Sequence, residues 1–176
     1  MNNTDVDAAC AMASGEAPPM VEPRTLVAVF ASPVAEYLLH FGRHLGYRTV
    51  LVEPSAELIT PAIAAHADGI GSAVDPSFAD STADVVICDH DRPELGDVLA
   101  HALDYPARWI GVMGSIRHTA PHLAALAERG VPEDKVALVH RPIGLNIGSR
   151  TPAEIAVATL AGLLADRADR PGGFSF

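Results

Sequence analysis

The stretch Trp109-Ile-Gly-Val-Met-Gly-Ser-Ile-Arg-His118 is the first of two glycine-rich turns that indicate what kind of chain this is. The second is Arg141-Pro-Ile-Gly-Leu-Asn-Ile-Gly-Ser-Arg150, which runs into Thr151-Pro-Ala-Glu154. In this last segment the Thr can cap a helix, the Pro suits the first helical position and the Glu can complete a capping box. We therefore expect each turn to open a helix.

Both turns have features of an anion site. Glycines let the backbone approach a ligand, and a new helix N-terminus offers unpaired N–H groups at the positive end of its dipole. Arg117 and Arg150 add forked guanidinium donors. One such turn alone is more often an ordinary connection between two elements, with its arginine in solvent. Two such turns in one chain, each with Ser and Arg, favour a binding site.

Working outward from these turns, short apolar runs alternate with longer amphipathic ones, which predicts an α/β fold. The apolar runs show little polar alternation, as in Val85-Val-Ile-Cys88, so we expect a doubly wound, mostly parallel sheet with helices on both faces. Residues 56–82 are ambiguous: Ala62–Ala67 could form a short helix, and Gly69–Val74 a short strand that leads into a loop. The predicted strands are Thr25–Ala31, Arg48–Glu53, Ala83–Cys88, Arg108–Met113 and Val136–Val139, and the predicted helices are Pro33–Leu45, Glu94–Asp104, Ile116–Arg129 and Pro152–Arg167.

Length and composition predict a single domain. A chain of 176 residues with 49% hydrophobic residues can bury one substantial core. We expect residues 25–168 to form that domain, with a flexible N-terminal arm at 1–24 and a C-terminal tail at 169–176. The two cysteines make neither a disulfide framework nor a thiolate metal cluster, and Cys88 is expected to be a small core residue.

The net charge argues against some classes of binding partner. Twelve Lys and Arg against 22 Asp and Glu give a net charge of −10, which argues against binding nucleic acid or anionic lipid. No apolar run approaches the roughly 18 residues of a membrane span, and Asp5 and Asp7 stand where a secretory signal would carry Lys or Arg. We therefore expect a cytoplasmic protein with no membrane association.

In a doubly wound sheet, ligands bind beyond the carboxyl ends of the strands. Predicted strands are followed by Ser32, His90-Asp91 and Gly114-Ser115, and Glu53 ends another. Glu53 lies 53 − 32 = 21 residues after Ser32, the separation at which an acidic residue binds ribose in dinucleotide-binding folds. However, Phe30-Ala-Ser-Pro-Val-Ala35 stands in place of G-x-G-x-x-G, which argues against NAD(P) and favours Ser32 as a plain helix start.

The eight histidines favour neither a metal site nor a catalytic residue, and a metal site at one of two pairs is the weaker alternative. His40/His44 and His118/His122 have i, i+4 spacing, but neither pair has the Glu of H-E-x-x-H. We expect His40, His44 and His122 to lie on solvated helix faces, and His90 and His118 to contact ligand. Asp91 could fix the tautomer of His90, or the segment could be a solvated turn. No Ser or Cys nucleophile has a nearby base, which argues against an enzyme.

The quoted motifs resemble a known family. Ile110–His118, the segment Ala127-Glu-Arg-Gly-Val-Pro132 and Arg141–Ala156 are together similar to the C-terminal Rossmann domain of the xanthine dehydrogenase accessory (XdhC/CoxI) family, over about Leu26 to Leu164. The resemblance implies a Rossmann-like fold and a maturation chaperone. Such a factor holds molybdenum cofactor, also called molybdopterin, and assists its insertion into an apo-enzyme partner, a molybdenum hydroxylase such as xanthine or carbon monoxide dehydrogenase.

Combining the resemblance with the turns gives a predicted cofactor-binding set. A His-Asp step typical of the family corresponds to His90-Asp91. The set is Gly114, Ser115, Arg117, His118, Gly144, Asn146, Gly148, Ser149, Arg150, His90, Asp91, Ser32 and Glu53.

The chain departs from the family pattern at several positions. The glycine-rich first loop is replaced at Phe30, Ser32 and Ala35, Ile116 stands where a second Arg is usual, and Asn146 stands where Asp is usual. Full-length relatives also carry a preceding domain, so we expect either a one-domain version that works with a separate partner or a degenerate member. The alternatives are an NAD(P)-linked oxidoreductase and a ligand-free interaction module; a homodimer also remains open.

Overall fold

Six parallel strands form the centre of the structure, a computed structural model that describes residues 11, 13–15, 23–114 and 120–173. Their order is β3-β2-β1-β4-β5-β6, so successive strands are placed on one side of β1 up to β3 and on its other side from β4 onward. At this central position Val27 of β1 is in register with Val50 of β2 and Val85 of β4. The strands are β1 (Thr25–Val29), β2 (Arg48–Val52), β3 (Gly69–Gly71), β4 (Ala83–Ile87), β5 (Trp109–Val112) and β6 (Val139–His140).

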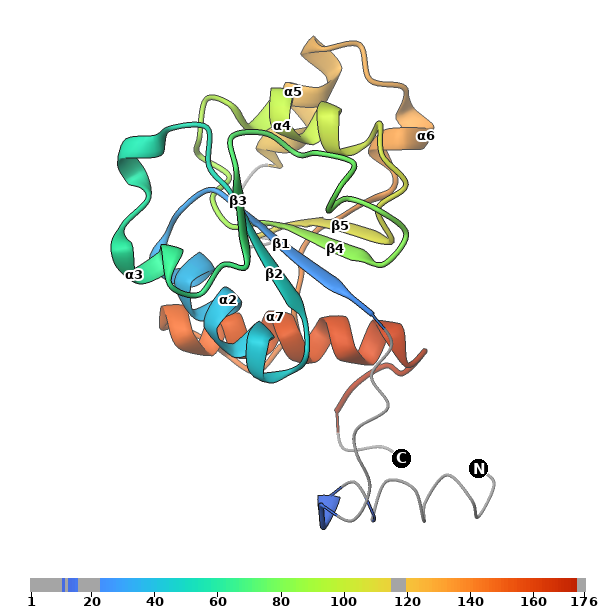
Figure 1. The fold of residues 1–176 in the computed structure, drawn as a ribbon. Coiled ribbons are helices and arrows are strands. Elements are labelled where there is room, and N and C mark those ends of the chain that lie inside the picture. The colour runs from blue at the N-terminus through green and yellow to red at the C-terminus, as the bar shows by residue number, and fades with distance from the viewer. Residues whose placement is uncertain (1–10, 12, 16–22, 115–119, 174–176) are drawn as a thin grey trace.

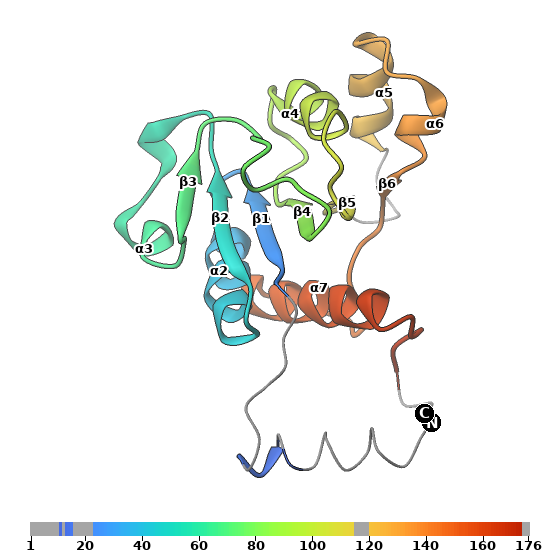
Figure 2. The ribbon, with the colours of Figure 1, turned by 45° about the vertical axis from the view of Figure 1, so that its right-hand side comes forward.

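Helices cover both faces of the sheet (Figures 1 and 2). On one face lie α2 (Pro33–His44) and α7 (Pro152–Arg167), which pack against each other. On the other face lie α4 (Leu95–Ala102), α5 (Pro121–Glu128) and α6 (Glu133–Val136). A 3₁₀ turn (Ala56–Leu58) and α3 (Pro61–Ala64) connect β2 to β3. Adjacent residues of β1 serve the two cores alternately, Leu26 and Ala28 one core and Val27 and Val29 the other.

The α/β, Rossmann-like, doubly wound parallel sheet predicted from the sequence is therefore confirmed, including the buried strands. Some helices and strands begin or end at other residues than predicted. The first strand stops at Val29 because Phe30 adopts a φ of 70°, which no strand accommodates. Cys88 is a buried core residue, as expected.

The predicted strand at Val136–Val139 is wrong. Residues 133–136 form α6, and the strand β6 begins only at Val139. Pro132 precedes the helix, Glu133 and Asp134 lie in its first turn and Lys135 in its last, so each charge complements the helix dipole. The apolar pattern from Val136 to Val139 is thus divided between a helix end, a turn and a strand start.

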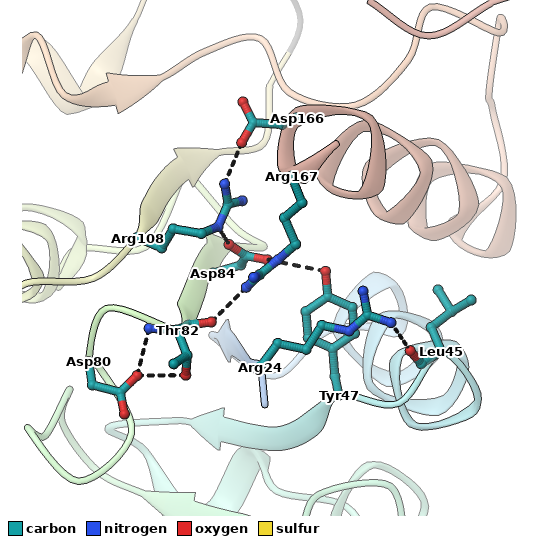
Figure 3. A network of polar contacts seen from close by, with 9 residues as sticks. All are labelled: Arg24, Leu45, Tyr47, Asp80, Thr82, Asp84, Arg108, Asp166 and Arg167. Carbon is teal, nitrogen blue, oxygen red and sulfur yellow. Dashed lines mark hydrogen bonds and ion pairs between the residues drawn. The ribbon is translucent and has the colours of Figure 1, made fainter. Parts of the chain in front are cut away.

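A buried carboxylate joins α7 to the amino end of β4 (Figure 3). Asp84 is fully buried and accepts hydrogen bonds from Arg108 Nε at 2.6 Å, Arg167 Nε at 2.9 Å and the Tyr47 hydroxyl at 3.2 Å. Arg167 also donates to the carbonyl of Thr82. Burial and the Asp84 charge raise the pKa of Tyr47. Because this cluster lies at the amino edge of the sheet, it holds the C-terminal helix without occupying the opposite edge.

Candidate functional site at the carboxyl edge

The structure brings the ends of five strands to one edge. Ser32 follows β1, Glu53 follows β2, His90 follows β4, Gly114 follows β5 and Arg141 follows β6. Since all six strands are parallel, these residues share the carboxyl edge, where doubly wound sheets bind ligands.

The loop after β1 has the structure of a helix start. Ser32 caps α2, and its hydroxyl accepts the N–H of Ala35 at 3.1 Å, which confirms the plain structural interpretation. Phe30 occupies the place of the first glycine of a dinucleotide loop, and its side chain is fully buried in the core. A positive φ at a bulky residue is uncommon, so the packing of this ring determines the loop.

The carboxylate of Glu53 is fully occupied by contacts within the protein. It is buried, and it accepts the N–H of Ala31 at 2.7 Å and the N–H of Ser55 at 2.9 Å. Arg92 binds it with two further hydrogen bonds of 3.2 and 3.0 Å, in a bidentate arrangement. The Arg92 guanidinium also lies 4.8 Å from the centre of the Phe30 ring. The ribose-binding position of a dinucleotide fold is thus filled by an internal ion pair.

Sequence reasoning missed Arg92. The available signal was its place in the turn after β4, at the same edge as Glu53 but 39 residues away along the chain. Its hydrogen bonds to Glu53, and next to Glu94, raise the pKa of Arg92 above its ordinary value.

His90 and Asp91 lie in a turn. The His90 Nε2 atom is 3.7 Å from the Asp91 carboxylate, longer than a hydrogen bond. Asp89 instead accepts the backbone N–H of Asp91 at 3.0 Å. The Asp91 side chain is 86% exposed, so the solvated-turn interpretation fits this geometry.

The two glycine-rich segments meet at Gly114. A Cβ atom placed there would lie 2.6 Å from Nη2 of Arg141, a separation that side chains do not adopt. Arg141 of the second segment therefore lies directly against the first segment, and its guanidinium would have to shift if residue 114 carried a side chain. Ser115, Arg117 and His118 lie outside the described residues.

The second segment packs against α7. Gly144 has a φ of 81°, and a Cβ there would be 3.1 Å from the backbone of Ala158. The N–H of Leu145 donates to the carbonyl of Ala158 at 2.9 Å, and Gly162 leaves room for this close approach. Close packing of backbone on backbone is thus a sufficient structural reason for the first glycine of this segment.

The start of α7 is as predicted, and its N–H groups are largely used internally. Thr151 and Glu154 form a complete capping box. The Glu154 carboxylate also accepts the N–H of Arg150 at 2.7 Å, and these bonds lower the pKa of Glu154. Asn146, Gly148 and Arg150 are exposed beside this helix start, and Ser149 is partly exposed.

The described part of α5 begins at Pro121, and the predicted start at Ile116 lies outside the described residues. The expectation that His122 is solvated is wrong, because its side chain lies in the first turn of α5 and only 4% of the residue is exposed. Burial, and next the charge of Arg141, lowers the pKa of His122. Its predicted partner at i, i+4, His118, is not among the described residues.

His122 and Arg141 line a cavity of about 400 Å³ between α5, α6 and β6. Its remaining lining residues are mostly apolar: Ala120, Leu123, Glu133, Val136, Ala137 and Val139. Neither His122 nor Arg141 belongs to the predicted cofactor-binding set.

The other histidine pair packs beside a third histidine. His44 is exposed as expected, but His40 is partly buried, with its Nδ1 atom 3.3 Å from Nδ1 of His66. Among the described residues, no group of three or more His, Cys, Asp or Glu side chains is arranged to hold a metal ion. No helix in that part of the chain is long and apolar enough to cross a membrane.

Strand order and the polar carboxyl edge define a Rossmann-type domain. A family model described as the XdhC Rossmann domain matches residues 26–163. The chain therefore belongs to the XdhC Rossmann-domain family, and the resemblance found in the sequence is confirmed.

Similar proteins are longer than this chain or structurally more distant. The uncharacterized protein YqeB of Escherichia coli K12 is 30% identical over 159 residues, which are 87% of this chain and 29% of YqeB. A crystal structure of a xanthine dehydrogenase (BH1974) from Bacillus halodurans is 24% identical, with a TM-score of 0.66 over 87% of this chain and 45% of that one. ChuY from E. coli CFT073 is 16% identical, with a TM-score of 0.45 over 84% of this chain and 91% of that one.

Proposed function

We propose that this chain is a maturation factor that binds molybdenum cofactor and assists its insertion into a molybdenum hydroxylase of the xanthine or carbon monoxide dehydrogenase type. It would act as a cytoplasmic chaperone rather than an enzyme. Its family membership supports this role. The chain spans less than a third of YqeB and less than half of the Bacillus structure, so the role is proposed for this chain by itself or with a separate partner.

The observation that carries the proposal is the contact between the two glycine-rich segments. Arg141 lies against Gly114, so the segments that resemble the family form one surface at the carboxyl edge. A guanidinium held at that surface suits the anionic phosphate of a pterin cofactor. In this proposal Arg141 and the edge around Gly114 and Gly148 hold the cofactor, with Ser115, Arg117, His118 and Arg150 as the further contacts expected from the sequence.

The internal ion pair at Glu53 supports the same choice of cofactor. A nucleotide at the first loop would have to compete with Arg92 for the Glu53 carboxylate and with the buried Phe30 ring for space. We therefore expect no turnover with nicotinamide cofactors.

The deciding experiment is activation of a molybdenum hydroxylase apo-enzyme at limiting cofactor. The apo-enzyme is incubated with molybdenum cofactor alone, with cofactor and this protein, and with cofactor and the Arg141→Gln variant. We expect this protein to increase the activated fraction and the variant to increase it less. Equal activation in all three tubes would contradict the delivery role.

A further inference from the structure

The outer side of α7 carries an apolar surface in place of the polar one that a surface helix usually has. Residues 155–165 include no charged residue. Val157 is 48% exposed, and Ala161, Leu164 and Ala165, which follow at helical spacing, are partly exposed. A helix that is apolar all round is typical of one that is covered on every side. The exposed side of α7 therefore indicates a contact that the described part of the chain does not make.

The neighbouring helix α2 extends this surface. Tyr37 is 40% exposed, and Phe41 and Leu45 are partly exposed one and two turns later. The helices α2 and α7 pack side by side on the same face of the sheet (Figures 1 and 2). Between them lies a hollow of about 480 Å³, which Phe41 and His44 of α2 and Val157 of α7 help to line. The two helices thus share one apolar surface, the α2–α7 face, with both protruding side chains and a hollow.

The distribution of charge favours a second copy of this chain as the partner. The chain carries a net charge of −10, so most contacts between two copies would bring like charges together. The α2–α7 face is different, because neither Tyr37–Leu45 nor residues 155–165 contain an acidic residue. Two such faces can therefore meet without bringing carboxylates together at the centre of the contact.

The ends of the two helices favour one arrangement of the copies. Glu154 lies in the first turn of α7, whereas Arg43 and His44 lie in the last turn of α2. A twofold axis that passes between the helices, perpendicular to the face, aligns α7 of one copy with α2 of the other in opposite directions. Glu154 of each copy then lies over the last turn of the other copy's α2. The side chain of Arg43 is 47% exposed beside its partner Asp68, and the antiparallel helix dipoles are also complementary.

The size of the face determines how strong the contact can be. At about 1.5 Å per residue, α2 and α7 are about 18 and 24 Å long, and two packed helices are about 20 Å wide. The face therefore covers roughly 400 Å² in plan, and its accessible area is larger because side chains protrude. Stable interfaces bury about 800 Å² per partner, so this contact belongs to the smaller, reversible class.

We propose that the α2–α7 face binds the same face of a second copy of this chain about a twofold axis. Both helices run from the carboxyl edge of the sheet towards its amino edge, so the carboxyl edges of the two copies point in opposite directions. Each copy keeps its own carboxyl edge whole. The inference is therefore independent of the proposed function, and its test needs no cofactor.

The test is sedimentation equilibrium of the full chain at concentrations from about 1 µM to about 1 mM, at low salt and pH 8. We expect a reversible equilibrium between monomer and dimer, with a dissociation constant in the micromolar range. A chain that stays monomeric at every concentration, or that forms higher oligomers, would overturn the proposal.

A pair of matched variants tests whether this face makes the dimer. Val157→Glu places a carboxylate of each copy in the contact and should weaken dimerisation roughly 100-fold or more. Ile70→Glu is the control, because Ile70 is also 48% exposed but lies on β3, and the variant has the same net charge. It should dimerise like the unmodified chain. Tyr37→Lys replaces Val157→Glu if unfolding curves show that the latter does not fold. Loss of the dimer in both the face variant and the control, or in neither, would contradict the assignment to this face.

Substitutions of His44 test the antiparallel arrangement, in which this residue lies near Glu154 of the other copy. His44→Lys should tighten the dimer a few-fold and His44→Glu should weaken it a few-fold, and salt should reduce both effects. If His44 lay near the same residue of the other copy, both substitutions would weaken the dimer by repulsion of like charges. That result would show that the proposed arrangement is wrong.

Discussion

Replacing Arg92 by Met tests how strongly the structure depends on the ion pair beneath the first loop. The Glu53 side chain is fully buried and that of Arg92 is 14% exposed, so water cannot replace the guanidinium. The variant keeps an apolar stem but removes two hydrogen bonds to a carboxylate that retains only its two backbone donors. An unpaired buried charge is the expected result.

The size of the effect follows from these contacts. Hydrogen bonds to charged groups contribute about 1.5–3 kcal/mol each, and removing one partner of a buried pair costs about 3–5 kcal/mol. We expect the free energy of unfolding to fall by about 3–5 kcal/mol. For a chain of this size that corresponds to a decrease in Tm of roughly 6–20 °C.

The assay is urea unfolding followed by circular dichroism, with a second substitution as the internal check. Adding Glu53→Gln to Arg92→Met removes the isolated charge, so the double variant should be more stable than the single one. Arg129→Met breaks an exposed pair with Asp97 and should cost less than about 1 kcal/mol. A loss below about 1 kcal/mol in Arg92→Met, or a double variant no more stable than the single, would refute the reasoning.

Three further predictions concern single residues. Burial raises the pKa of Cys88 to about 12. In a variant with the other cysteine replaced by Ser, we expect a thiol reagent at pH 8 to modify Cys88 only at the rate of unfolding. Modification at the rate of a free thiol would contradict this. Because the pKa of His122 is lowered in the folded protein, His122 of the unfolded chain is protonated first as the pH falls below about 6.5. The free energy of unfolding should therefore decrease from pH 7 to pH 5. Denaturant curves at both pH values should show a smaller decrease for His122→Phe. Gly144 has a positive φ and lies close to the backbone of α7, so Gly144→Ala should lower the free energy of unfolding by about 2–4 kcal/mol. Gly148 has a positive φ in open space, so Gly148→Ala should lower it by about 1 kcal/mol. Equal losses would show that packing against α7 is not the reason for Gly144.

The sheet could be predicted because its signal is local. Each central strand is an uninterrupted apolar run, such as Val85-Val-Ile, that has to be covered on both faces. The start of α7 was equally local, since Thr151 and Glu154 are three residues apart and their side chains cap one turn. Such patterns span only a few neighbouring residues, so they can be interpreted without knowing the rest of the fold.

The side-chain contacts at the carboxyl edge of the sheet could not be predicted in the same way. The Glu53–Arg92 pair joins residues 39 positions apart, and nothing near Glu53 in the sequence indicates that its carboxylate is occupied. His122 was expected to lie on a solvated helix face, but burial of a helix face depends on what packs against it. Here the folded chain buries His122, and the strand prediction for residues 136–139, most of which line a pocket beside it, was itself wrong.

Both outer strands of the sheet are very short: β3 has three residues and β6 has two. Each therefore leaves few unpaired backbone groups, so the sheet offers little template for another chain to add a strand. Short edges of this kind protect against edge-to-edge aggregation. They also mean that any protein that binds this domain would do so mainly through side chains of its helices and loops, so substitutions on those surfaces, rather than in the strands, are where specificity for one partner over another can change.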